Sequence, residues 1–234
     1  MGNSKQISTR LLVLTSALTA MVVVLQLLGS FIRLGMFSIS LVLVPIVIGA
    51  VICGVGAGAW LGFAFGAAVL LSGDAAAFLA IDPVGTVLTV LVKGTAAGLA
   101  SGVVYKAFVK LCDSWKARIT ANSNEYGAET QQTKLEIARD LALKYLPVVM
   151  AAIVCPVVNT GVFLIGCNLF FYETVAGWAM ALGYESAAAY MILGLAGGNF
   201  LFELLFNVLL SPAIVRVLDI FEQQHSKKKN FIRQ

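Results

Sequence analysis

The sequence predicts an all-α, polytopic membrane protein with six transmembrane helices and both termini in the cytoplasm. Three observations support this fold class: 59% of the 234 residues are hydrophobic, only 12% are charged, and the apolar residues form long unbroken runs. Soluble domains are about one quarter charged, so this chain has too little polar surface to cover a soluble core. The composition excludes a cytosolic enzyme, a nucleic-acid-binding module and a disordered chain, and the unbroken runs exclude a transmembrane barrel.

Hydropathy and turn residues divide the chain into six apolar stretches. No cleavage site follows the first stretch, so we expect a retained helix rather than a signal peptide. The second and third are short for a full span, which predicts tilt or shielding by neighbours. The fifth contains Pro147 and Pro156, which predict a kink or break. The six stretches are residues 8–30, 40–53, 57–72, 83–109, 141–171 and 187–218.

The basic residues indicate which side of the membrane is cytoplasmic. Fourteen of the 16 Lys and Arg residues lie at or before the start of the first stretch, around the connection between the fourth and fifth, or at or after the end of the sixth. The positive-inside rule places these segments in the cytoplasm. Residues 1–234 are therefore expected to form a single integral membrane domain, with a polar cytoplasmic connection at about 111–140 and a basic C-terminal tail at about 219–234.

No catalytic or metal-binding pattern is present in the sequence. It contains no P-loop, GxSxG or HExxH motif, and its four cysteines and one histidine lack the spacing of a zinc or redox site. We therefore expect no enzymatic activity, no bound cofactor and no metal. Without a P-loop, the chain is not expected to use ATP by itself.

Two ionisable side chains remain inside the predicted spans, Lys93 and Glu203. Charges at membrane depth are costly, and they usually face a cavity or one another. Lys93 follows Pro83 by ten residues, which is about 15 Å along a helix. Two interpretations stay open. Lys93 lines a polar pocket and binds a carboxylate or phosphate, or it forms a salt bridge with Glu203 that only locks two helices.

Several amides accompany these charges. Asn199, Glu203 and Asn207 recur at intervals of four residues, which places them on one face of the sixth helix. Asn159 and Asn168 lie on the fifth helix. Buried amide and carboxyl groups need hydrogen-bond partners, which another helix or a polar ligand supplies. The candidate substrate-binding residues on the helices are therefore Lys93, Asn159, Asn168, Asn199 and Glu203.

The two outer connections, residues 31–40 and 71–83, are too apolar for loops that lie free in water. We expect them to fold over the site as lids, although contact with lipid headgroups would also explain their composition. Arg33 lies in the first connection and is the remaining candidate substrate-binding residue.

Small residues at four-residue spacing predict faces on which helices approach closely. Such a face packs within the fold or, in the first helix, docks a membrane partner through Ser16 and Ala20. The other such residues are Gly62 and Gly66 in the third stretch, and Gly94, Gly98 and Gly102 in the fourth.

Four segments together carry a resemblance to a known family. They are Leu41–Ala50 with the Gly-rich turn that follows it, Gly62–Gly66, the sequence Val92-Lys93-Gly94, and the Asn199…Glu203…Asn207 stripe before Leu210-Ser211-Pro212. This combination resembles the substrate-binding S-components of energy-coupling factor (ECF) vitamin transporters, over nearly the whole chain. The first helix of that family carries an alanine pair at four-residue spacing. In this sequence Ser16 replaces the first alanine, and Ala20 stands at the second position.

The resemblance implies a six-helix protein of the bacterial plasma membrane that captures a vitamin from outside. It implies that the vitamin lies beneath the first lid, at the outer ends of helices four to six. The first helix would associate with a transmembrane coupling subunit bound to two ATPase subunits, which use the ATP. A pantothenate- or folate-like acid is the expected substrate, because a buried lysine can bind a carboxylate.

Two other function classes stay open. One is a stand-alone channel or secondary carrier, which would transport without ATPase partners; the sequence shows no inverted repeat or paired broken helices that would favour it. The other is a membrane scaffold that binds no ligand.

Overall fold

The computed structural model describes residues 9–232 except 32, 35–36, 39–40 and 126–133. Apart from one pair of two-residue antiparallel strands, β1 (Arg33–Leu34) and β2 (Phe37–Ser38), every element in this part of the chain is helical. The elements are α1 (Thr9–Gly29), α2 (Leu43–Ile52), α3 (Val55–Ser72), α4 (Ala76–Leu79), α5 (Pro83–Glu125), α6 (Lys134–Phe170), α7 (Tyr172–Ala181), α8 (Ala187–Ala189), the π-helix η1 (Tyr190–Gly197) and α9 (Gly198–Ile232).

Within the described residues, five helical segments are long and apolar enough to cross a membrane. They are Thr9–Gly29, Val55–Ser72, Pro83–Arg118, Arg139–Phe170 and Ala187–Phe221. The predicted all-helical, multi-pass architecture is therefore confirmed. The second predicted span corresponds to α2, whose 10 residues rise about 15 Å in a hydrocarbon layer about 30 Å thick.

The short helix α2 is shielded by its neighbours. Leu43, Ile46 and Val47 are fully buried, and α2 packs against α1, α3, α5, α6 and α9. The helix ends just before Gly54, whose φ of 97° is accessible mainly to glycine. The chain therefore turns directly from α2 into α3 at this glycine.

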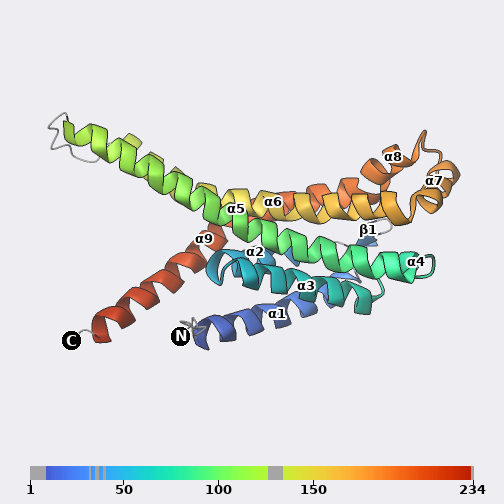
Figure 1. The fold of residues 1–234 in the computed structure, drawn as a ribbon, viewed down its shortest axis with the longest axis horizontal. Coiled ribbons are helices and arrows are strands. Elements are labelled where there is room, and N and C mark those ends of the chain that lie inside the picture. Colours follow the sequence, from blue (N-terminus) through green and yellow to red (C-terminus); the bar gives the residue numbers. More distant parts are fainter. Residues whose placement is uncertain (1–8, 32, 35–36, 39–40, 126–133, 233–234) are drawn as a thin grey trace, which may run out of the picture.

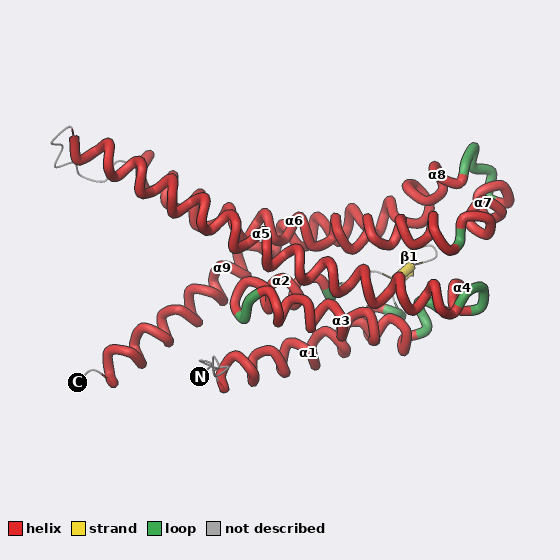
Figure 2. The backbone as a smooth tube through the Cα atoms, viewed as in Figure 1, coloured by secondary structure: helices red, strands yellow, loops and turns green. Residues whose placement is uncertain are grey.

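The long helices lie side by side and set the shape of the molecule. Figure 1 shows α1, α3, α5 and α6 with their axes roughly parallel, α5 running opposite to the other three, and α5 and α6 extending together past α1 and α3. The N-terminal end of α1, the C-terminal ends of α5 and α9 and the N-terminal end of α6 lie at one end of the bundle, and α4, α7 and α8 lie at the other (Figure 2).

Helices α5 and α6 are longer than the apolar stretches that predict them. The fourth stretch is predicted to end near residue 109, whereas α5 continues to Glu125; the fifth is predicted to begin near residue 141, whereas α6 begins at Lys134. Residues 110–125 contain no proline or glycine, so nothing local ends the helix where the apolar run ends. The predicted polar connection is therefore mostly helical in the described residues.

In α6 the predicted break is absent, and the sixth stretch contains an irregular segment. Helix α6 continues without interruption through Pro147 and Pro156, as membrane helices can when neighbouring groups satisfy the freed backbone carbonyls. The sixth stretch, predicted to be one regular helix, instead passes through the π-helix η1 before it becomes α9. π-Helical turns are rare and occur frequently at functional sites.

A glycine seam joins α3 to α5 through direct backbone contact. A Cβ atom on Gly62 would overlap the main-chain carbonyl of Gly94, and one on Gly98 would overlap that of Gly58. Only glycine permits helices to approach this closely. Gly62, Gly94 and Gly98 therefore pack within the fold, and the seam fixes the position of Lys93, which is adjacent to Gly94.

Candidate functional site

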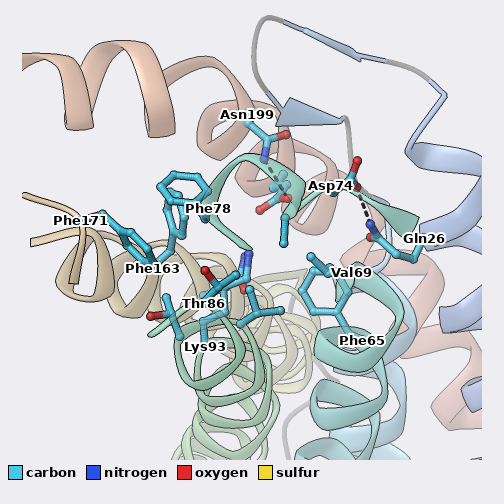
Figure 3. A pocket seen from close by; sticks show the side chains of 15 residues that line it. Gln26, Phe65, Val69, Asp74, Phe78, Thr86, Lys93, Phe163, Phe171 and Asn199 are labelled. Carbon is cyan, nitrogen blue, oxygen red and sulfur yellow. Dashed lines mark hydrogen bonds between the residues drawn. The ribbon is translucent and has the colours of Figure 1, made fainter. Parts of the chain in front are cut away.

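A cavity lies among α1, α3, α5, α6, α9 and the connection between α3 and α5 (Figure 3). Its volume is about 70 Å³, well below the range of about 300–1,000 Å³ that most small-molecule sites occupy. Aromatic and aliphatic side chains form most of the wall. The polar groups that line it are one ammonium, two carboxyl groups, three amides and two threonine hydroxyls, from Lys93, Asp74, Glu203, Gln26, Asn159, Asn199, Thr86 and Thr89.

Lys93 extends from α5 into this cavity between two aromatic rings. Its Nζ lies 5.7 Å from the ring centre of Phe65 and 5.2 Å from that of Phe163. Both distances are within the range of cation–π attraction. Among the residues that the structure describes, no ion pair joins Lys93 to Glu203. The aromatic rings therefore hold the ammonium group, which stays accessible from the cavity.

The predicted polar stripe of the sixth helix forms one face of α9. Asn199 Nδ2 donates to Glu203 Oε1 over 3.2 Å, and Asn207 Nδ2 donates to the main-chain oxygen of Glu203 over 2.8 Å. Glu203 and Asn207 are 2% and 1% exposed. Asn199 and Glu203 line the cavity, whereas Asn207 lies one turn further and does not.

Among the described residues, four buried oxygen atoms of the cavity side chains have no hydrogen-bond partner. They are Oε2 of Glu203, Oδ1 of Asn159, Oδ1 of Asn199 and Oγ1 of Thr89. Leaving a buried polar group unpaired costs about 1–3 kcal/mol. A fifth such atom, Oδ1 of Asn207, lies outside the cavity. The four that share one cavity are placed to bind a polar occupant.

An aromatic cluster closes one side of the cavity. Phe78 of α4 lies edge to face against Phe163, Phe171 and Trp178, with ring centres 5.9, 4.9 and 5.5 Å apart. Such pairs contribute about 0.5–1.5 kcal/mol each beyond the area they bury. The cluster anchors the connection between α3 and α5 over the cavity, the place predicted for the second lid.

A buried amide of α1 ties the same connection from the other side. Gln26 is 2% exposed, and its Nε2 donates to Asp74 Oδ2 over 2.7 Å and to Ser72 Oγ over 3.3 Å. Figure 3 shows the Gln26–Asp74 contact at the edge of the cavity. The first helix is therefore linked directly to the segment that carries Phe78.

Four of the predicted substrate-binding residues come together in this cavity: Lys93, Asn159, Asn199 and Glu203. Asn168 does not join them. It is exposed and lies in a separate groove with Ile165 and Ile192. Asn159 and Asn168 are nine residues apart, or two and a half turns at about 3.6 residues per turn, so they lie on opposite faces of α6.

The remaining predicted residues lie outside the cavity or outside the described side chains. Ser16 and Ala20 are exposed on α1, on the side away from the buried Leu18 and Val22. The backbone of Arg33 belongs to β1, but its side chain is not among those described.

Sequence reasoning missed four polar residues of the cavity. Thr86 and Thr89 precede Lys93 by seven and four residues, so their position on the same helix face could have been predicted. Gln26 was also detectable, as an amide within an otherwise apolar run. Asp74 lies in the predicted outer connection 71–83, and its contact with Gln26 joins positions 48 residues apart, which no spacing within one helix predicts.

Comparison with known proteins identifies the family. The model of the family described as ECF transporter, substrate-specific component, matches residues 10–215. No curated protein and no solved structure matches the chain significantly. The match begins in α1 and ends in α9, so it spans every helix that lines the cavity. The chain therefore belongs to the substrate-specific components of ECF transporters, which makes it a membrane transport subunit.

Proposed function

We propose that this chain captures a vitamin or related small molecule from outside the cell in the cavity around Lys93 and delivers it inward with an ATP-driven ECF module. The observation that carries the proposal is a polar, partly open cavity inside an apolar helix bundle, lined by a lysine and by oxygen atoms without partners. A bundle that had only to be stable would fill this space with apolar side chains.

The orientation of the chain supports capture from outside. Both chain ends and the α5–α6 tip share one end of the bundle, and the basic residues concentrate in these segments. By the positive-inside rule this end is cytoplasmic, in the plasma membrane of a bacterium. The short α2 completes a six-helix arrangement with an even number of crossings. The connection with Asp74 and Phe78 then lies on the outer side, where substrate enters.

The partners are a transmembrane coupling subunit and two ATPase subunits. The exposed face of α1 with Ser16 and Ala20 is the proposed contact with the coupling subunit, since small side chains let a second helix approach closely. The ATPase subunits provide the energy for transport. The substrate is an acid of the pantothenate or folate type, because Lys93 offers a positive charge to a carboxylate.

Binding and transport test the proposal separately. The purified chain in lipid nanodiscs should bind one vitamin of a panel that includes pantothenate and folate, measured by isothermal titration calorimetry. Liposomes should accumulate this vitamin only when the ECF module and ATP are present. No binder across the panel would contradict the capture function, and accumulation without the module would favour a stand-alone carrier.

A bulky substitution tests the docking face. Ala20→Trp should keep vitamin binding but abolish uptake with the module, because the larger side chain separates the two helices. Leu28→Trp is the control, since Leu28 is also exposed on α1 and lies two turns further along. Equal uptake by the two variants would remove Ala20 from the contact.

A further inference from the structure

The polar atoms of the cavity separate into a donor and a set of acceptors. The donor is the ammonium group of Lys93, which carries three N–H groups and makes no hydrogen bond among the described residues. The acceptors are Oε2 of Glu203, Oδ1 of Asn199 and Oδ1 of Asn159, each buried and without a partner. We call these three oxygens the acceptor wall. They come from two helices, α6 and α9.

The acceptor character of the wall follows from the hydrogen bonds already made. Asn199 Nδ2 donates to Glu203 Oε1, so the amide oxygen of Asn199 is the atom left over. If this amide were turned around, its oxygen would face a carboxylate oxygen, and two acceptors would repel one another. Oε2 of Glu203 accepts when the carboxylate is ionised. The wall therefore requires an occupant with N–H or O–H groups.

Lys93 and the acceptor wall do not satisfy one another. The ammonium group lies over the rings of Phe65 and Phe163 and forms no ion pair with Glu203 within the described chain. The interpretation of Lys93 and Glu203 as a purely structural salt bridge would require that pair. Because the two charges stay apart, each is left to contact a different part of an occupant.

This separation excludes several classes of ligand. An apolar molecule would leave both the ammonium group and the acceptor wall unpaired. An acid without hydrogen-bond donors would satisfy Lys93 only, and a simple cation would satisfy the wall but oppose the charge of Lys93. Phe78 and Phe163 add an aromatic surface beside both groups, which suits a flat or apolar middle section.

We infer that the substrate is a small acid that also carries hydrogen-bond donors. Its anionic group is bound by Lys93, and its N–H or O–H donors are bound by the acceptor wall. The inference rests on the proposed function and narrows its substrate class. Because the donor Lys93 and the acceptor wall lie at fixed positions, they would also make the site specific. A competitor that lacks either group leaves a buried polar atom without a partner.

Ligand capture tests the class directly. The chain in nanodiscs is incubated with an extract of rich growth medium and washed, and the bound molecule is released by denaturation and identified by mass spectrometry. A molecule with both an acidic group and N–H or O–H donors is expected. A captured molecule that lacks either one overturns the inference but keeps the transport function. If no molecule is captured, the result contradicts the proposed function itself.

Matched ligand and protein changes then assign the contacts. The methyl ester of the captured acid should bind the native chain about 10- to 100-fold more weakly than the acid, whereas Lys93→Met should bind acid and ester equally. Glu203→Gln should weaken the parent ligand about 10-fold or more, and methylation of the ligand's donor nitrogen or oxygen should add little further loss in this variant.

The surface variant Lys144→Met is the control and should bind the acid as the native chain does, since Lys144 lies outside the cavity. Thermal unfolding of each ligand-free variant separates lost contacts from lost folding. If native protein binds the ester as tightly as the acid, the assignment of Lys93 is wrong. If Glu203→Gln binds the parent ligand with native affinity, the acceptor wall does not hold the donors.

Discussion

Two regions of the molecule place a lysine near an acidic residue of α9, with opposite results. At the end of the bundle with the chain termini, Lys144 Nζ lies 2.7 Å from Asp219 Oδ2, and the two side chains are 44% and 31% exposed. In the cavity, Lys93 and Glu203 form no such pair among the described residues, and Glu203 is 2% exposed. The ion pair therefore forms at the exposed position, where water would solvate both charges even if they were not paired.

The difference shows what each region is selected for. An exposed ion pair contributes about 0–1 kcal/mol, because water and salt screen it. A buried, unpaired charge lowers the stability of the empty protein. The fold nevertheless holds Lys93 and Glu203 apart, through the aromatic rings on one side and the hydrogen bond from Asn199 on the other. This separation supports the proposal that the two residues serve a ligand rather than the bundle.

The largest effect is expected from breaking the glycine seam between α3 and α5, which positions Lys93 but not Lys144. Gly62→Ala places a methyl group against the main-chain carbonyl of Gly94, so α3 and α5 must separate, at about 3 kcal/mol of stability. The control Gly161→Ala makes the same chemical change on α6, where no atom lies within 4 Å of the new Cβ. Thermal unfolding in detergent compares the two. Equal unfolding temperatures would mean that the seam is not tightly packed.

Removing both cavity charges should stabilise the empty protein. The double variant Lys93→Met with Glu203→Gln eliminates a half-buried and a buried charge that form no ion pair with one another, and replacing buried charges by neutral side chains often raises stability by about 1–4 kcal/mol. The unfolding temperature of the ligand-free variant should therefore exceed that of the native chain, while ligand binding is lost. The same double change at the surface pair, Lys144→Met with Asp219→Asn, should lower it slightly. A decrease of equal size in both variants would show that the two regions do not differ.

The contact of Gln26 with Asp74 and Ser72 extends the comparison, because this amide lies at the cavity but has hydrogen-bond partners within the protein. Gln26→Leu removes the amide that bonds to Asp74 and Ser72, so stability should fall by about 1–2 kcal/mol. Ser72→Ala removes only the longer of the two contacts and should have a smaller effect. Hydrogen exchange of residues 73–82 should rise in Gln26→Leu. Unchanged exchange there would contradict a role of Gln26 in holding this connection.

The smallest effect is expected at the surface pair. Lys144→Met should lower stability by less than about 1 kcal/mol at low ionic strength, and the difference should disappear in high salt. Unfolding temperatures measured across a salt series give both values. A loss that persists in high salt would show that the pair is shielded from solvent and contributes as a buried contact does.

The sequence predicts those features that depend on composition within one helix. Lys93 and Glu203 stand out because a charge in an apolar run is rare, and both line the cavity. The same rule selected Asn159 and Asn168 equally, although helical geometry separates them onto opposite faces. Contacts between distant segments, such as Gln26 with Asp74, depend on how the helices pack, and no spacing within one helix encodes them.

The sequence patterns also do not predict where helices end or where they become irregular. Hydropathy marks where the chain leaves the membrane, but α5 continues to Glu125 because its polar residues still favour a helix. The π-helix η1 consists of residues such as Met191, Ile192 and Leu193, which are equally common in regular membrane helices. Its wider hydrogen-bonding pattern has no distinct residue signature.

The π-helix acts as a fixed rotational offset between α8 and α9. Each residue of an α-helix turns the chain by about 100°, and a π-turn accommodates one additional residue in the same rise. If Tyr190–Gly197 became a regular α-helix without losing a residue, Asn199 and Glu203 would rotate together by about 100° relative to the α7–α8 end. Both side chains would then leave the cavity, although neither had been mutated. The π-helical geometry of η1 thus determines the site as much as the residues that line it.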